Sequence, residues 1–218
     1  MRWGMVIDLT KCIGCYGCVV TCKAEHHLPP NVFWGRAITG EIGTYPAVRK
    51  QFIPVLCNHC EEAPCVKVCP SGATQMREDG IVWVDYDKCV GCRYCLVSCP
   101  YQRRTFLSAD VMSQGYYGDK GLSELELKGQ ELYPHQEGTT VKCNFCMERI
   151  DEGLKKGLNP GVDREATPAC VNECTAKARI FGDLDDPESE ISRLIKMRKA
   201  IPFHHEFGTD PSVYYIQY

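Results

Sequence analysis

Sixteen cysteines carry most of the chemistry that this sequence could perform, and they fall into four sets of four with none left over. We name these sets the first to fourth quartets. Two have the spacing C-x2-C-x2-C-x3-C, one has C-x2-C-x4-C-x3-C, and the last has C-x2-C-x23-C-x3-C. In chain order, the quartets are Cys12, Cys15, Cys18 and Cys22; Cys57, Cys60, Cys65 and Cys69; Cys89, Cys92, Cys95 and Cys99; and Cys143, Cys146, Cys170 and Cys174.

The spacing of the first and third quartets is that of bacterial ferredoxins, whose cysteines hold [4Fe-4S] clusters. A short loop can present three thiolates to one cluster, whereas the fourth cysteine, three residues further along a following helix, points away from that loop. It can then reach a neighbouring cluster, which gives crossed ligation. We therefore predict that all sixteen cysteines are iron ligands in four [4Fe-4S] clusters, and that no quartet is a self-contained cage.

Two other uses of cysteine are open at this point. Paired C-x2-C units also form structural zinc sites, and the fourth quartet taken alone has that pattern. Three cysteines at successive three-residue steps, twice over, are more than a zinc module requires. Disulfides are the second alternative, but the N-terminal residues lack a secretory signal, so we expect a reducing compartment in which thiols stay free.

The net charge and the lengths of the apolar stretches argue against nucleic-acid binding and against a membrane-spanning segment. The formal net charge of -3 provides no net positive field for nucleic-acid phosphates. No apolar stretch approaches the ~18 residues that span a bilayer. We expect no nucleic-acid partner and no direct membrane span.

An internal duplication organises the chain. Residues 6–15 match residues 83–92 at a constant offset of 77, and the second quartet corresponds to the fourth, with Asn58 matching Asn144. From this duplication we predict two ferredoxin-like modules.

Short strands and helices must position the cysteine loops. Apolar runs predict strands at residues 4–8, 51–56, 81–85, 105–107 and 179–181, and Asp79-Gly80 predicts a hairpin turn. Short helices should follow the third cysteine of each quartet and carry the fourth. Near the C-terminus, Asp186 as N-cap and Pro187 at the first position predict an amphipathic helix whose apolar face packs on the core.

Two segments fall outside the repeat. Residues 108–140 are rich in glycine and acidic side chains and predict a surface insertion, which either contacts a partner or is simply solvated. The aromatic residues 202–218 lack helix formers, and we predict an extended C-terminal tail that wraps an adjacent surface.

Charged and histidine residues near the quartets have a functional and a plain interpretation. Five cations beside the cysteine loops could raise the reduction potentials of the clusters, although solvated surface charge is the commoner role of such residues. They are Lys11, Lys23, Lys67, Lys88 and Arg93. The pairs His26-His27 and His204-His205 are predicted to be surface or interface residues rather than metal ligands. Asn58 and His59 lie inside a cysteine loop and are predicted to shape its hydrogen bonding.

The sequence resembles the iron-sulfur electron-transfer (beta) subunits of dimethyl sulfoxide reductase-type molybdopterin oxidoreductases over nearly its whole length. The resemblance rests on the four quartets, on residues 57–65 (CNHCEEAPC), on residues 182–187 (GDLDDP) and on residues 208–215 (GTDPSVYY). Polysulfide, thiosulfate and respiratory arsenate reductase subunits are similar, as is the small subunit of pyrogallol-phloroglucinol transhydroxylase. The 108–140 insertion departs from the common pattern.

The resemblance implies how the quartets pair, first with fourth and second with third. Carried over by position, it implies the following ligand sets: Cys12, Cys15, Cys18 and Cys174; Cys22, Cys143, Cys146 and Cys170; Cys57, Cys60, Cys65 and Cys99; and Cys69, Cys89, Cys92 and Cys95.

The expected fold is α+β, with two ferredoxin-like modules of short strands and helices around four [4Fe-4S] clusters, plus the insertion and the tail. One module comprises residues 1–56 and 141–186, the other residues 57–107. Residues 108–140 form the insertion and residues 187–218 a C-terminal helix and tail.

The function that the resemblance implies is an electron relay without bond chemistry of its own. Electrons would pass between a large molybdopterin (molybdenum or tungsten) catalytic subunit and either a quinone-linked membrane anchor or a soluble redox partner, as in anaerobic respiration. The complex would be soluble or held at a membrane by its partners, in the cytoplasm or, by co-export, in the periplasm. The alternative is a free-standing polyferredoxin that serves soluble oxidoreductases.

Overall fold

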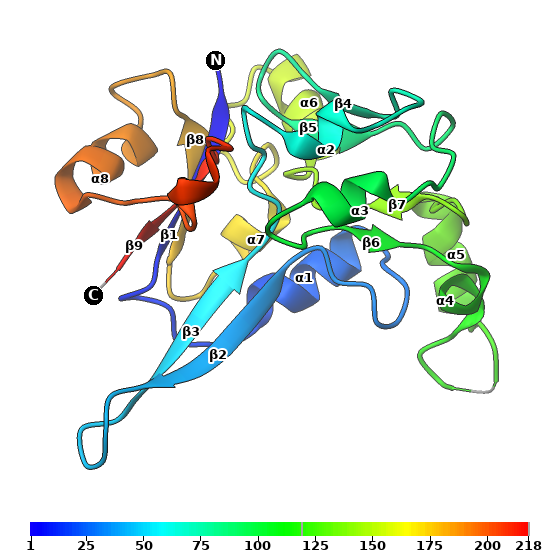
Figure 1. Ribbon diagram of the computed structural model, residues 1–218, viewed down its shortest axis with the longest axis horizontal. Coiled ribbons are helices and arrows are strands. Elements are labelled where there is room, and N and C mark those ends of the chain that lie inside the picture. The colour runs from blue at the N-terminus through cyan, green and yellow to red at the C-terminus, as the bar shows by residue number, and fades with distance from the viewer. Residues whose placement is uncertain (119, 218) are drawn as a thin grey trace.

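The computed structural model describes residues 1–118 and 120–217, and it mixes short helices with short strands, as expected for an α+β fold (Figure 1). The helices and strands, in chain order, are β1 (Trp3–Asp8), α1 (Gly17–Glu25), β2 (Arg36–Ile42), β3 (Arg49–Val55), α2 (Pro64–Lys67), β4 (Thr74–Met76), β5 (Val82–Val84), α3 (Tyr94–Ser98), β6 (Thr105–Phe106), α4 (Ala109–Ser113), α5 (Glu124–Leu132), β7 (Thr140–Val141), α6 (Met147–Lys155), α7 (Ala169–Asn172), β8 (Arg179–Asp183), α8 (Glu190–Arg198), a 3-10 turn η1 (His205–Phe207) and β9 (Val213–Ile216).

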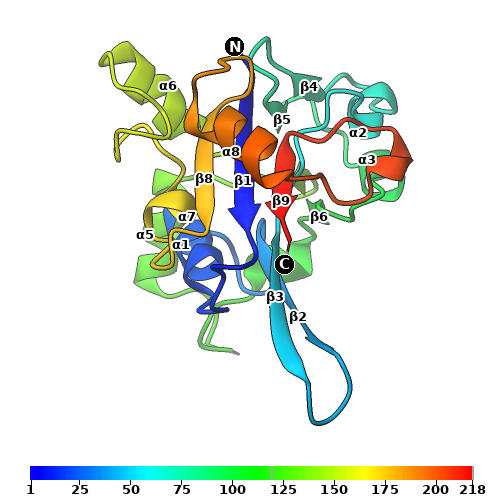
Figure 2. The ribbon, with the colours of Figure 1, turned by 90° about the vertical axis from the view of Figure 1, so that its left-hand side faces the viewer.

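A three-stranded sheet joins the two ends of the chain. β1 lies in its centre, antiparallel to β8 and parallel to β9, so that Met5 is opposite both Phe181 and Val213 (Figure 2). Every residue of β1 is buried, in keeping with its nearly continuous apolar sequence. The sheet therefore brings the loop of the first quartet, which follows β1, next to the fourth quartet, which precedes β8.

The five predicted strands are all present, as β1, β3, β5, β6 and β8, and the described residues contain four further strands that were not predicted, β2, β4, β7 and β9. Asp79-Gly80 forms the turn between β4 and β5, with Gly80 at a φ of 80°. β6 pairs with β7 and so ties the end of the third quartet to the start of the fourth. Among the unpredicted strands, β2 pairs with β3 in a hairpin that projects from the body of the molecule (Figure 1). Nearly all its side chains are exposed, so its sequence lacks a buried face.

The helices that follow the cysteine loops are shorter than expected. α1, α2, α3 and α7 each contain the third cysteine of a quartet, so these helices begin before that cysteine rather than after it. Only Cys22 lies within its helix, however. The other three fourth cysteines, Cys69, Cys99 and Cys174, lie just beyond the ends of α2, α3 and α7, because these helices have only four or five residues.

The 108–140 insertion packs on the same chain. Its helix α5 begins with a capping box formed by Ser123 and Glu126. The hydroxyl of Tyr116 donates to the carbonyl of Leu28 at 2.9 Å, and a ring nitrogen of His135 lies 2.7 Å from the carbonyl of His26. The insertion therefore covers the segment that follows α1. Asp119, which belongs to the insertion, lies outside the described residues.

Two C-terminal predictions are wrong. The last helix, α8, begins after Ser189 rather than after Asp186, because Ser189 Oγ accepts the N–H of Ser192. Residues 213–216 are not a tail that wraps an adjacent surface: they form β9, an edge strand of the three-stranded sheet, with Tyr215 almost wholly buried. Tyr218, the end of the predicted tail, lies outside the described residues.

Candidate metal-cluster site

All sixteen thiols are free, so the disulfide alternative has no support in the structure. Two of the sixteen cysteines, Cys15 and Cys92, are exposed, and the other fourteen are buried or half-buried. Cys15 and Cys92 are equivalent positions of the internal duplication, since 77 residues separate them.

The loops of the first and third quartets share their backbone conformation as well as their spacing. Gly14 and Gly91 have φ values of 68° and 67°, and Tyr16 and Arg93, which precede α1 and α3, have 58° and 63°. A Cβ atom at Gly14 would lie 2.3 Å from the ring of Phe52. Glycine is required there both by the left-handed conformation and by the close approach.

The first quartet meets the end of the fourth. Burial raises the pKa of Cys12, and the neighbouring Cys18 and Cys174 raise it further. Sγ of Cys15 lies 3.9 Å from the hydroxyl of Thr175, the residue after Cys174. These contacts gather Cys12, Cys15 and Cys18 around Cys174, and we name this group site 1.

A second group surrounds Cys22. Burial raises the pKa of Cys22 well above its usual value, and Cys143 and Cys170 raise it further. Cys146 lies in the same group. Burial raises its pKa, and the nearby Cys170, Cys143 and Cys22 raise it further. We name this group site 2. Here the last cysteine of the first quartet lies near three cysteines of the fourth.

Site 3 gathers around Cys60. Burial raises the pKa of Cys60 to about 12, with further contributions from Cys57, Cys65 and Cys99. Cys99 belongs to the third quartet by sequence but lies here with the second quartet.

The remaining cysteines, Cys69, Cys89, Cys92 and Cys95, are the fourth ligand set that the resemblance implies, and we name this set site 4. Helix α2, which ends just before Cys69, lies against α3, which contains Cys95. Burial alone would raise the pKa of Cys69, but the N–H of Thr74 and the hydroxyl of Ser71 lower it below its usual value. No direct contact between Cys69 and the third quartet is among the described interactions.

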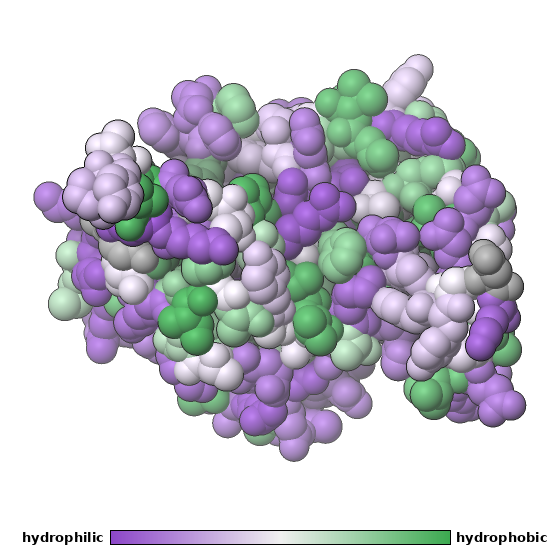
Figure 3. Space-filling view, turned by 90° about the horizontal axis from the view of Figure 1, so that it is seen from below, coloured by the Kyte–Doolittle hydropathy of each residue, from purple (hydrophilic) through white to green (hydrophobic). Residues whose placement is uncertain are grey.

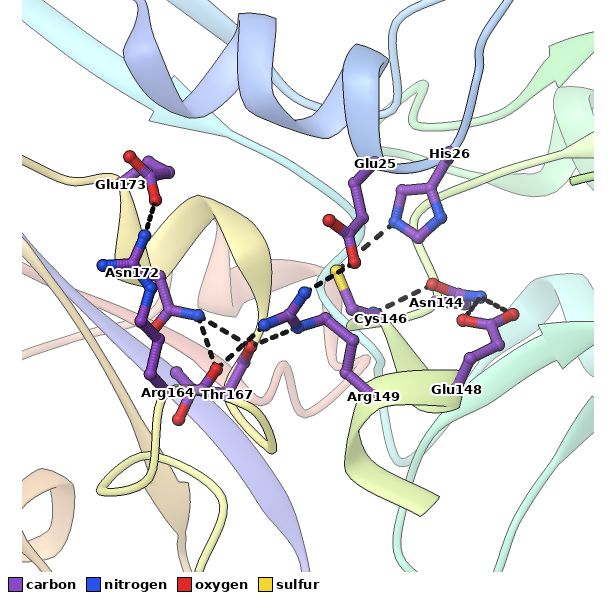
Figure 4. Close-up of polar contacts among 10 residues, drawn as sticks. All are labelled: Glu25, His26, Asn144, Cys146, Glu148, Arg149, Arg164, Thr167, Asn172 and Glu173. Carbon is purple, nitrogen blue, oxygen red and sulfur yellow. Dashed lines mark hydrogen bonds and ion pairs between the residues drawn. The ribbon is translucent and has the colours of Figure 1, made fainter. Parts of the chain in front are cut away.

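One segment clamps the ligands of site 2 (Figure 4). Arg149 in α6 donates to Glu25 at the end of α1 at 2.8 Å and to the carbonyl of Thr167, just before α7, at 2.9 Å. Asn144 accepts the backbone N–H of Cys146 and donates to Glu148. These contacts hold together the three segments that carry Cys22, Cys146 and Cys170.

The donor sets fit iron-sulfur clusters better than zinc ions. Among residues 1–118 and 120–217, no three His, Cys, Asp or Glu side chains converge as they would around a single metal ion. Zinc needs four ligands at about 2.3 Å from one point. Sets made only of cysteine sulfur suit an iron-sulfur cluster, whose iron atoms are held by thiolates.

Backbone N–H groups also donate hydrogen bonds to cysteine sulfurs, which favours the thiolate form that binds metal. The N–H of Thr74 points at Sγ of Cys69 at 3.3 Å, and the N–H of Ala178 points at Sγ of Cys174 at 3.2 Å. Hydrogen bonds of this kind stabilise a thiolate. Metal ligation requires such deprotonated cysteines, although burial raises the pKa of most of the thiols that have a shifted value.

The cations singled out from the sequence have ordinary surroundings. Lys11, Lys67 and Lys88 are exposed and lie beside Asp8, Glu62 and Asp85. Lys23 donates to the carbonyls of Pro29 and Val32. Arg93 lies over the ring of Phe106, at 3.9 Å from its centroid.

Sequence reasoning missed three cations that are buried: Arg104, Lys142 and Arg179, with exposed fractions of 8%, 3% and 5%. Each stands within five residues of a quartet cysteine in the sequence, which is the signal that could have found them.

The prediction of surface histidines is confirmed for His204, His205 and His27, which are exposed, and it is wrong for His26. His26 is 2% exposed, and its Nε2 lies 3.3 Å from Sγ of Cys146 (Figure 4). Its ring packs against Trp34. Burial, and then the neighbouring His135, lower the pKa of His26 to about 3. As predicted for the loop histidine, His59 accepts a hydrogen bond, from the N–H of Val82.

The face from which the β2–β3 hairpin projects has apolar patches set among hydrophilic side chains (Figure 3). Within the part of the chain that the structure describes, no helix combines the length and the apolar character needed to cross a membrane.

Comparison with known proteins identifies relatives along the whole chain. Residues 48–114 match the model of the 4Fe-4S dicluster domain. The chain is 39% identical to the iron-sulfur subunit of arsenate respiratory reductase from Shewanella sp. (strain ANA-3), over 100% of this chain and 97% of that protein. It is 40% identical to a selenate reductase subunit from Mesobacillus selenatarsenatis, over 99% and 72% of the two chains. It is 36% identical to iron-sulfur subunit 1 of the Hdr-like menaquinol oxidoreductase from Archaeoglobus fulgidus, over 98% and 82%.

Proposed function

The chain belongs to the family of iron-sulfur subunits of molybdopterin oxidoreductases, and from this premise we propose that it relays electrons along a single line of four [4Fe-4S] clusters. The ligand sets of the proposal are sites 1 to 4. When bound, each cluster accepts and releases one electron at a time. The chain's own residues bind the clusters, fix their order and exclude water from them.

The order of the sites is the observation that carries the proposal. Site 1 adjoins site 2, because Cys18 lies close enough to raise the pKa values of both Cys22 and Cys170. Site 2 adjoins site 3, because Cys57 lies close enough to raise the pKa of Cys143. Site 3 adjoins site 4 through a buried cluster of side chains that contains Cys65 and Cys95. These neighbours support an unbranched sequence of sites from 1 to 4.

The two ends of this sequence are also the two places where cysteines reach the surface. Cys15 belongs to site 1 and Cys92 to site 4. Each end has exposed apolar side chains at equivalent positions of the duplication: Val20 is 65% exposed and Val97 87%. Exposed apolar residues around an exposed redox site favour docking of a partner protein.

We assign one end to a large molybdopterin catalytic subunit and the other to a membrane anchor or a soluble redox partner. A relay must receive electrons at one end and deliver them at the other, and the structure offers two equivalent ends. The relative from Archaeoglobus fulgidus is a subunit of a menaquinol oxidoreductase, which supports a quinone-linked partner. Attachment to a membrane would then come from that partner.

The test is anaerobic purification of the full chain, alone and together with the large subunit. We expect about sixteen irons and as much acid-labile sulfide per chain, four for each cluster, and a stable complex with the large subunit. Stoichiometric zinc, or about eight irons, would contradict the proposed cluster content. A fully loaded chain that binds no molybdopterin subunit would instead support a free polyferredoxin.

A further inference from the structure

Three buried cations have no carboxylate partner among the described residues. Arg104, Lys142 and Arg179 form no ion pair with any Asp or Glu in residues 1–118 and 120–217, and each is at most 8% exposed. The Nε of Arg179 and one Nη of Arg104 also lack a hydrogen-bond partner. A buried charge without a counter-charge is costly, so something else must balance these three.

Arg179 lies between sites 1 and 2. Its guanidinium reaches Sγ of Cys170, a site 2 ligand, at 3.4 Å. Burial alone would lower the pKa of Arg179, but Cys170 and Cys18 raise it above the ordinary value. Cys18 belongs to site 1. One guanidinium therefore interacts with ligands of both sites.

Lys142 lies between sites 2 and 3. Its ammonium group donates to the carbonyl of Cys143, a site 2 ligand, at 2.6 Å, and to the carbonyl of Val82. The same charge acts on Cys143 and on Cys65, a site 3 ligand, where it lowers the thiol pKa against the larger effect of burial.

Arg104 lies between sites 3 and 4. It donates to the hydroxyl of Thr74 at 3.2 Å, and the N–H of Thr74 in turn points at Sγ of Cys69, a site 4 ligand. Burial alone would lower the pKa of Arg104, whereas Cys65 of site 3 and Cys95 of site 4 raise it.

The placement follows a rule in the sequence for the two arginines. Arg104 stands five residues after Cys99, and Arg179 five residues after Cys174, the last cysteines of the third and fourth quartets. A proposed relay of four sites has three junctions, and each junction contains one of the three buried cations. The cations are thus distributed along the line rather than gathered at one site.

We propose that Arg179, Lys142 and Arg104 are the counter-charges of the three junctions, each raising the reduction potentials of both clusters that it separates. The inference rests on the proposed four-cluster relay. A cluster with four thiolates carries negative charge that increases on reduction, so a fixed cation in a poorly solvated interior stabilises the reduced form. A cation shared by two neighbours also weakens their mutual repulsion. Electrons can then occupy adjacent sites, and no proton or bond has to move.

The experiment is a redox titration of the anaerobically purified full chain, or of its complex, followed by electron paramagnetic resonance. Arg179→Gln should lower the potentials of the clusters at sites 1 and 2. The shift expected is at least tenfold in the equilibrium constant, about 59 mV for one electron. Lys142→Gln should act in the same way on sites 2 and 3, and Arg104→Gln on sites 3 and 4. Arg179→Lys, which retains the charge, should keep the potentials of these two clusters close to those of the unmodified chain.

Lys88→Gln is the matched control, because Lys88 is exposed and adjoins Cys89 in the sequence. It should leave all four potentials within a twofold change in equilibrium constant. Equal shifts at all four sites, or none in the Gln variants, would overturn the proposal. If a Gln variant loses iron, the loss should be confined to the two flanking clusters; loss from all four sites would also overturn it. Fewer than four clusters in the unmodified chain would instead contradict the proposed relay.

Discussion

Nε2 of His26 lies 3.3 Å from Sγ of Cys146, although 120 residues separate the two in the chain. Nδ1 of His26 has no partner among the described residues, and the low pKa keeps the ring neutral. We assign the single ring proton to Nε2, because a thiolate ligand can only accept a hydrogen bond. His26 is therefore a positioning residue of site 2.

Replacing His26 with Phe tests this contact. The Phe ring can retain the packing on Trp34 but cannot donate to Cys146. We expect a lower reduction potential for the site 2 cluster alone, and a loss of about 1 kcal/mol in the free energy of unfolding. Redox titration and denaturant unfolding measure the two effects. An unchanged site 2 potential would show that the hydrogen bond does not influence the cluster.

Arg149 is expected to hold site 2 together through its bonds to Glu25 and Thr167. Arg149→Met should reduce the free energy of unfolding by about 2 kcal/mol, since hydrogen bonds of charged groups are lost in a partly buried position. Iron should be lost first from site 2. Arg193→Met, which breaks an exposed pair with Glu188, is the control and should change the free energy by less than about 1 kcal/mol. Equal effects of the two variants would contradict the clamp.

The acid sensitivity of the fold should depend on His135. Burial lowers the pKa of His135 in the folded chain. As the pH falls below about 6.5, the unfolded chain therefore binds a proton more readily than the folded chain, and stability decreases. His135→Gln retains a donor for the carbonyl of His26 but cannot titrate.

We expect His135→Gln to lose less stability than the unmodified chain between about pH 7.5 and pH 5.5, on either side of the ordinary histidine pKa. Denaturant midpoints at the two pH values measure this difference. His205→Gln, at an exposed histidine, is the control variant. If both variants behave alike, His135 does not account for the acid sensitivity.

The exposed apolar residues at the two ends should bind different partners. Val97→Glu should weaken binding of the partner at site 4 about tenfold, or about 1.4 kcal/mol, because a charge replaces a buried apolar contact. Val20→Glu should do the same for the partner at site 1. Val162→Glu, at a valine that is 83% exposed elsewhere, should affect neither. Co-purification and titration with each partner would decide; an effect of Val162→Glu as large as the others would contradict the assignment.

The sequence indicated what is local in this molecule. The cysteine spacing, the 77-residue duplication and the hairpin turn at Asp79-Gly80 depend on neighbouring residues, and the structure has the matching left-handed turns at Gly14 and Gly91. The cap of α8 was misplaced because Asp186 and Ser189 are both good N-cap residues.

What the sequence could not indicate depends on contacts between distant segments. β9 pairs with β1 across nearly the whole chain, so an extended tail could not be distinguished from a strand of the sheet. His26 approaches Cys146, and Arg179 lies between Cys18 and Cys170, only after the sheet has brought the two ends of the chain together. Burial of these polar residues is a tertiary property and leaves no periodic pattern.

The central claim is that quartets exchange their last cysteines, so that four clusters form one line. Its most direct test is Cys22→Ser in the anaerobically purified full chain, with each cluster followed by electron paramagnetic resonance. The account predicts that the cluster held by Cys143, Cys146 and Cys170 is lost or altered. The cluster held by Cys12, Cys15 and Cys18 should remain. A change confined to the latter cluster would contradict the account.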